Sequence, residues 1–128
     1  MPEPDVAPPQ YLCASADLPE RGKAVSFHVV QWREPVRAFA LRFDGRAVAY
    51  LNRCAHVPTE MDWQDGEFLD RDRKYIMCSI HGAVYDPLSG QCVMSPCNRG
   101  RLTRIELTES EGQVYWHPTR DTKPAFED

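Results

Sequence analysis

The sequence lacks three features that would have placed it in other classes of protein. No apolar run approaches the roughly 20 residues of a transmembrane helix, so we expect no membrane span. Lys and Arg number 15 against 19 Asp and Glu, and the net charge of −4 disfavours nucleic acid as a partner. The first ten residues carry neither the basic nor the apolar region of a signal peptide, so the expected location is the cytoplasm.

The sequence also lacks an internal repeat and any convincing amphipathic helix longer than a turn or two. Instead it has short β-prone runs separated by turn signals, of which Asp44-Gly45 and Glu111-Gly112 are the clearest. The expected strands are residues 25–32, 36–43, 46–51, 74–77, 83–85, 91–93, 102–107 and 113–116. Pro58 is well placed to begin one helical turn over residues 58–63. This pattern predicts an all-β fold, a small antiparallel sandwich or barrel.

A chain of 128 residues has the usual length of one domain. Four prolines within residues 1–10 predict a disordered leader, because proline blocks regular structure. Residues 118–128 are polar and are expected to be a flexible tail. The folded domain is therefore expected over residues 11–117.

The number of cysteines is odd, with five residues, and two of them lie close to histidines. Cys54-Ala-His56 and Cys78-Ser-Ile-His81 supply two thiolates and two imidazoles, the ligand set of a mixed Cys₂His₂ [2Fe–2S] centre. Zinc takes the same four ligands, and spacing alone does not exclude it. The glycine after the second histidine, the turn at residues 86–90 and the proline loop that follows are not required by zinc, and they favour iron–sulfur.

These motifs, with Gly90 and Ser95-Pro96 downstream, resemble the Rieske family, most closely its soluble bacterial ferredoxins and small Rieske proteins. The resemblance covers residues 11–117. It implies a Rieske-like antiparallel β-scaffold carrying a small cluster-binding subdomain over about residues 52–98.

The resemblance also implies roles for individual residues. The two cysteines of the motifs would hold the buried iron of a [2Fe–2S] cluster, and the two histidines would hold the outer iron. Tyr85 would donate a hydrogen bond that stabilises the reduced cluster, and Pro96 would lie in a third loop that covers it.

The chain departs from the family pattern in ways that bear on the reduction potential of the cluster. The segment between His56 and Cys78 is long, which indicates an insertion around residues 64–73. Thr59 and Ile80 occupy the positions where respiratory members carry an extra disulfide, which is therefore absent. Ala83 stands where high-potential members carry a hydrogen-bonding serine. We therefore expect a reduction potential in the lower half of the range of roughly −150 to +300 mV.

The expected function is that of an electron-transfer protein with no substrate site of its own. Such a carrier would pass single electrons from a flavoprotein reductase to a terminal oxygenase, as a monomer that docks transiently. An alternative is the Rieske-like small subunit of a multi-subunit reductase, such as nitrite reductase, bound permanently to a large subunit. A third possibility is a redox-sensing module.

The remaining cysteines allow two interpretations. Cys92 and Cys97 are either a redox-active pair, with Cys97 packed over the cluster as a variant of this interpretation, or two small buried hydrophobes, and the last interpretation is favoured. Cys13 is expected in the core. The charge run at residues 71–74 is expected to be a solvated surface, with docking of an acidic partner as the alternative.

Overall fold

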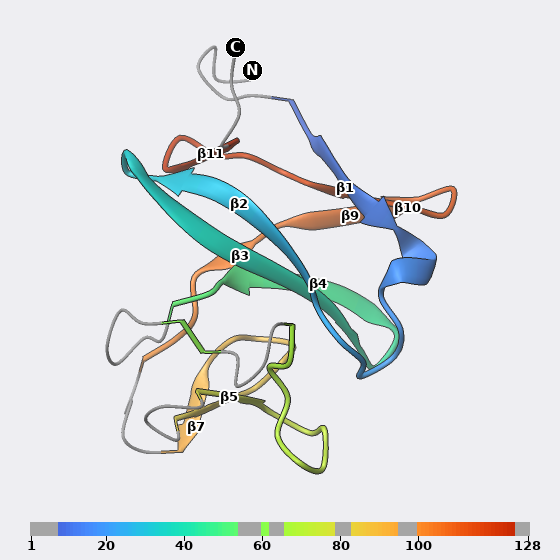
Figure 1. Cartoon of the computed structure of the whole chain (residues 1–128), viewed down its shortest axis with the longest axis vertical. Helices are drawn as coiled ribbons and strands as arrows, with labels where there is room; N and C mark the ends of the chain where they lie inside the picture. Colours follow the sequence, from blue (N-terminus) through green and yellow to red (C-terminus); the bar gives the residue numbers. More distant parts are fainter. Residues whose placement is uncertain (1–7, 54–59, 62–65, 79–82, 95–99, 125–128) are drawn as a thin grey trace.

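The computed structural model describes residues 8–53, 60–61, 66–78, 83–94 and 100–124. Within these ranges the chain forms three antiparallel sheets and one short 3₁₀ helix, Ser15–Asp17 (Figure 1). The expectation of an all-β fold is therefore confirmed. No helix in the described part of the chain is long and apolar enough to cross a bilayer.

The largest sheet has five strands in the order β11-β2-β3-β4-β8. These strands are β2 (Val25–Gln31), β3 (Glu34–Phe43), β4 (Arg46–Leu51), β8 (Arg104–Ile105) and β11 (Thr122–Pro124). β11 pairs with β2 within the stretch for which the sequence predicted a flexible tail, so that prediction did not anticipate a strand here. A polar side chain explains the difference, because Thr122 is buried and its hydroxyl donates a hydrogen bond to Gln31 of β2.

A second sheet contains β1 (Gln10–Ala14), β10 (Gln113–Trp116) and β9 (Leu107–Ser110), in that order. The sequence predicted one strand over residues 102–107, and this prediction was wrong. The chain leaves the five-stranded sheet after Ile105 and joins the second sheet at Leu107. Between them, the carbonyl oxygen of Glu106 accepts a hydrogen bond from the backbone N–H of His117.

The third sheet is small and lies below the five-stranded sheet in Figure 1, away from the chain termini. It consists of β5 (Ile76–Met77), β6 (Val84–Tyr85) and β7 (Cys92–Met94), with β6 in the middle. The two loops that join these strands carry the second ligand motif and the predicted turn at residues 86–90.

Two hydrophobic cores form on opposite faces of the five-stranded sheet. Side chains of a strand alternate between faces, and on β3 Phe39 and Leu41 belong to one core while Ala38 and Ala40 belong to the other. The first core joins the sheet to the small sheet, and the second joins it to the β1-β10-β9 sheet. Because both faces are covered, the centre of β3 reads as a continuous apolar run.

Residues 66–77, which include part of the predicted insertion, are anchored in the first core. Phe68 is buried, and its ring stacks on that of Phe39 with centroids 3.8 Å apart. The carbonyl oxygen of Phe68 accepts a hydrogen bond from the backbone N–H of Met77, and Leu69 bridges to Ile76. This part of the insertion is therefore packed into the fold. Residues 71–75, which lie between Leu69 and Ile76, are exposed, as expected for a solvated charge run.

Three two-residue turns have both central residues at positive φ, the type that matches the twist of a β-hairpin. Asp44-Gly45 and Glu111-Gly112 confirm the sequence prediction. The third, Trp32-Arg33 between β2 and β3, was not anticipated because neither residue favours positive φ. The candidate helical turn at residues 58–63 falls largely outside the described residues.

Candidate metal centre

Cys78 lies directly after β5 and is completely buried. Its backbone N–H donates a 2.8 Å hydrogen bond to the carbonyl oxygen of Ala83, directly before β6. This bond joins the residues on either side of the segment 79–82, which contains the predicted ligand His81 and lies outside the described residues. Cys78 carries a thiol rather than a disulfide, which is the chemistry that an iron ligand requires.

The ends of the first ligand loop are held together by Asn52. This side chain is only 3% exposed, and its Oδ1 accepts a 2.7 Å hydrogen bond from the backbone N–H of Met61. The backbone N–H of Asn52 donates to the carbonyl oxygen of Arg37 on β3, which fixes Asn52 to the five-stranded sheet. Residues 53–60 are thus spanned by one buried side chain. Sequence reasoning missed Asn52, although a polar residue ending an apolar strand just before a ligand motif is a usable signal.

The third loop follows β7, and main-chain hydrogen bonds join the residues on its two sides. The backbone N–H of Cys92 donates to the carbonyl oxygen of Gly100, and that of Leu102 donates to Gly90, both at 2.8 Å. Gln91 and Arg101 form an isolated antiparallel bridge between them. Pro96, which the resemblance placed over the cluster, belongs to this loop and lies outside the described residues.

Tyr50 connects the base of the third loop to the five-stranded sheet. Its hydroxyl donates a 2.8 Å hydrogen bond to the carbonyl oxygen of Pro87, in the turn that follows β6. Its ring lies so close to Gly90 that a Cβ at that position would be 2.7 Å from Tyr50 Cε1. Burial raises the pKa of Tyr50 to about 12, so the hydroxyl stays protonated and keeps this hydrogen bond. Sequence reasoning missed this residue as well.

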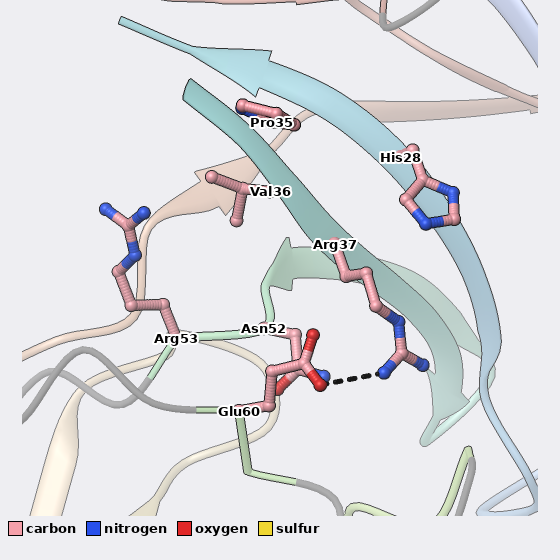
Figure 2. Close-up of a pocket in the computed structure, with 7 residues that line it drawn as sticks. All are labelled: His28, Pro35, Val36, Arg37, Asn52, Arg53 and Glu60. Atoms are coloured by element: carbon pink, nitrogen blue, oxygen red, sulfur yellow. Dashed lines mark hydrogen bonds and ion pairs between the residues drawn. The ribbon is translucent and has the colours of Figure 1, made fainter. Parts of the chain in front are cut away.

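A pocket of about 260 Å³ lies beside the first ligand loop (Figure 2). It is lined by His28 of β2, by β3 residues and by residues that flank the loop on both sides. Arg37 and Glu60 point toward each other in Figure 2 and form a 3.0 Å ion pair. Arg53, directly before Cys54, forms a longer contact of 3.5 Å with Glu34. The edge of the predicted cluster site therefore carries charged groups of both signs.

Of the six residues that the sequence analysis assigned to the site, the structure describes two. Cys78 and Tyr85 are both completely buried in the first core, and Tyr85 lies on β6 with Ile76 and Cys92 as its pairing partners. The other assigned residues, Cys54, His56, His81 and Pro96, lie outside the described residues. Among the described residues, no three His, Cys, Asp or Glu side chains group as metal ligands.

Two predictions about the remaining cysteines can be compared with the structure. Cys13 is buried at 6% exposure, as expected, and burial raises the pKa of its thiol. Cys92 is disulfide-bonded, with a partner outside the described residues. The favoured interpretation of Cys92 as a small buried hydrophobe was therefore wrong. Spacing could not reveal this, because two cysteines with four residues between them fit both interpretations.

Three sheets around two cores, with a buried thiol in a closed loop between two strands, define an all-β scaffold suited to an iron–sulfur cluster. A family profile described as the Rieske [2Fe-2S] domain matches residues 9–118. The chain belongs to the Rieske [2Fe–2S] family, as the sequence motifs indicated. Membership makes a [2Fe–2S] cluster its cofactor and electron transfer its chemistry.

Solved structures with the same fold include two ferredoxins. The ferredoxin of carbazole 1,9a-dioxygenase from Nocardioides aromaticivorans IC177 is 16% identical, with a TM-score of 0.67 over 88% of this chain and 100% of its own. A ferredoxin from Sphingomonas yanoikuyae B1 is 21% identical, with a TM-score of 0.61 over 87% of this chain and 99% of its own.

A third similar structure is a complex of reduced oxygenase and oxidised ferredoxin in carbazole 1,9a-dioxygenase. It is 22% identical, with a TM-score of 0.61 over 84% of this chain and 90% of the matched chain. No curated protein matches the chain.

Proposed function

We propose that this protein is a Rieske-type ferredoxin that passes single electrons from a flavoprotein reductase to a terminal oxygenase. The observation that carries the proposal is the buried Cys78 thiol in a loop closed onto β6, within a domain of the Rieske family. The full-length match to two ferredoxins supports a free-standing carrier. The oxygenase as partner is supported by the solved oxygenase–ferredoxin complex. A cytoplasmic location fits this role.

In this proposal Cys54 and Cys78 hold the inner iron, and His56 and His81 hold the outer iron. The bound cluster supplies a one-electron couple. The chain's own part is to fix the ligand loops and to exclude water from the inner side. Asn52 and the Cys78–Ala83 hydrogen bond fix the two ligand loops, while the first core covers Cys78.

Electron transfer to an oxygenase requires a docking surface near the outer iron. Arg53 and Glu60 flank the first ligand loop and face the pocket of Figure 2, so we place them within that surface. The patch presents charges of both signs, which favours brief, salt-sensitive docking over a permanent interface. The flavoprotein reductase would use the same surface at a different time.

The test of the cluster is electron paramagnetic resonance of the dithionite-reduced protein, with iron and sulfide analysis. We expect two irons per chain and a rhombic signal with an average g value below that of the free electron. Cys78→Ser should abolish the signal, whereas Cys13→Ser, at a buried cysteine in the other core, should keep it. A colourless protein that contains zinc would contradict the proposal.

The test of the carrier role is stopped-flow reduction of a terminal oxygenase by the reduced protein. Arg53→Glu should change the rate constant several-fold and alter its salt dependence. Arg46→Glu is the matched control, because it makes the same charge change at the opposite end of β4 and should have little effect. Stable co-purification of a large reductase subunit would instead support the small-subunit alternative.

A further inference from the structure

A second pocket, of about 220 Å³, lies at the end of the five-stranded sheet where β2 turns into β3. We call it the Trp32 pocket, and it is lined by Val30, Trp32, Arg33, Arg120, Asp121 and Lys123. Trp32 is 70% exposed, more than any other large hydrophobic side chain in the described part of the chain. A tryptophan in solvent adds little to a core, whereas tryptophan is enriched where proteins bind one another.

The backbone at this hairpin tip is set against its own sequence. Trp32 and Arg33 have φ of 47° and 70°, in the left-handed region that bulky side chains rarely adopt. The comparable turns at residues 44–45 and 111–112 each have glycine at the second position. Asn-Gly would fit the same turn at lower cost, because nothing at an exposed tip demands a bulky residue. Strain of this kind is typical of a functional site.

The Trp32 pocket adjoins the pocket beside the first ligand loop. Val30 lines the Trp32 pocket, Pro35 lines the other pocket, and these two residues are direct partners across β2 and β3. Lys123 of β11 pairs with Val30 on its other side, so the three side chains form one row on a face of the sheet. Phe39, an even number of residues from Pro35 on β3, packs toward the small sheet from the same face. One surface therefore extends from the residues that flank the first ligand loop to the Trp32 pocket.

The Trp32 pocket is positively charged, although the chain as a whole has a net charge of −4. Its lining contains three cationic side chains, Arg33, Arg120 and Lys123, and one carboxylate, Asp121. Within the described part of the chain, Arg33 and Lys123 have no carboxylate partner. The carbonyl oxygen of Asp121 accepts a 3.1 Å hydrogen bond from the backbone N–H of Trp32, which ties the two segments together. An exposed indole between unpaired cations is complementary to an apolar hollow with carboxylates at its rim.

We propose that the Trp32 pocket is a remote anchor for an acidic face of the terminal oxygenase. Trp32 inserts into an apolar hollow of that face, and Arg33 and Lys123 pair with carboxylates around it. Because the Trp32 pocket is continuous with the surface beside the first ligand loop, an oxygenase held there also reaches that loop. The anchor rests on the proposed function, and it adds affinity and orientation at a distance from the cluster ligands.

The first test separates docking from folding. Trp32→Asn/Arg33→Gly installs a sequence that this turn favours, so this variant should melt at a higher temperature than the unmodified protein. Its dissociation constant for a terminal oxygenase should nonetheless rise by about tenfold, the scale of an interface tryptophan. Tyr11→Ala, at a 58% exposed aromatic residue of β1, is the control and should leave the dissociation constant unchanged. An unchanged constant in the double variant would overturn the anchor.

The second test locates the bound oxygenase. A carbodiimide joins lysine amines to carboxylates in contact with them, and the chain has lysine only at Lys23, Lys74 and Lys123. We expect a cross-link from Lys123 to an acidic peptide of the oxygenase, and its yield should fall at high salt. A cross-link from Lys74 alone would place the oxygenase at the exposed charge run of residues 71–74 and would contradict the proposal.

The outcomes distinguish failure of the anchor from failure of the proposed function. If the reduced protein reduces no terminal oxygenase in the stopped-flow test, the proposed function and the anchor both fail. If Arg53→Glu slows the reduction of an oxygenase but Trp32→Asn/Arg33→Gly does not weaken its binding, the anchor alone is wrong. A dimer in sedimentation that dissociates in the double variant would show that a second copy of the chain occupies the Trp32 pocket, and would also refute the assignment.

Discussion

Replacing Asn52 by alanine should loosen the predicted cluster site more than it weakens the fold as a whole. The substitution removes the Oδ1 acceptor of Met61 and leaves the backbone N–H of a completely buried residue without that partner. It also removes a side-chain link between the two ends of the first ligand loop. The β-sheet beneath keeps its main-chain pairing.

The expected magnitude follows from the cost of a buried unsatisfied donor, about 1–3 kcal/mol. For 128 residues at about 2.1 cal/mol/K each, the entropy of unfolding is about 0.27 kcal/mol/K. The melting temperature should therefore fall by about 4–11 °C. In addition, the cluster should be lost at temperatures where the fold persists, because the loop that holds Cys54 and His56 opens first.

The control is Gln31→Ala. Gln31 is also a buried amide, at 8% exposure, and it accepts a hydrogen bond from Thr122 on β11, remote from the ligand loops. Both variants should melt earlier by circular dichroism. Only Asn52→Ala should bleach in visible absorption well before the dichroism changes. If both variants bleach and unfold together, the reasoning that Asn52 specifically secures the ligand loop is refuted.

Further predictions concern stability and potential. Tyr50→Phe should cost about 1–2 kcal/mol at pH 7 by leaving the Pro87 carbonyl unpaired. Burial raises the pKa of Tyr50 from 10 to about 12, so the contribution of its hydroxyl to stability is complete below pH 10 and is lost as pH rises toward 12. In urea unfolding, the free energies of unfolding of the two proteins should therefore converge above pH 10. Hydrogen bonds from Arg42 hold the pKa of Glu109 below its ordinary value of 4.5. The stabilisation by this interaction is present above pH 4.5 and is lost as pH falls through the lowered pKa. Glu109→Gln should therefore lose less stability from pH 6 to pH 3 than the unmodified protein does. An equal loss in the two proteins would contradict the assignment. Protein-film voltammetry should find a midpoint in the lower half of the roughly −150 to +300 mV range, and one near its top would disprove the tuning argument.

The sequence predicted those elements whose signals are local. Asp44-Gly45 and Glu111-Gly112 identified two hairpin turns, because these residue types tolerate positive φ. The turn at Trp32-Arg33 has the same conformation but no local signal. It is imposed by the pairing of Gln31 with Glu34 and by a hydrogen bond from Trp32 to the carbonyl oxygen of Asp121.

Failures of prediction arose where distant segments meet. The run over residues 102–107 has uniform strand character, yet its two halves pair with different sheets. β11 carries little apolar character and forms a strand because Thr122 finds a buried polar partner on β2. Neither outcome can be read from periodicity, since each depends on which neighbour is available.

By itself the sequence predicted the chemistry of this protein: two Cys–His pairs at ligand spacing within a chain of short strands indicated the Rieske family, which the family profile confirms. The identity of the ligands and the spacing within each Cys–His pair are local properties, so they can be recognised in a short stretch of sequence. Only the tertiary structure decided what holds the ligand loops. Asn52 reaches Arg37 and Met61, and Tyr50 reaches Pro87 across 37 residues of sequence. Such contacts exist only once the sheets have packed, because packing alone brings these residues together.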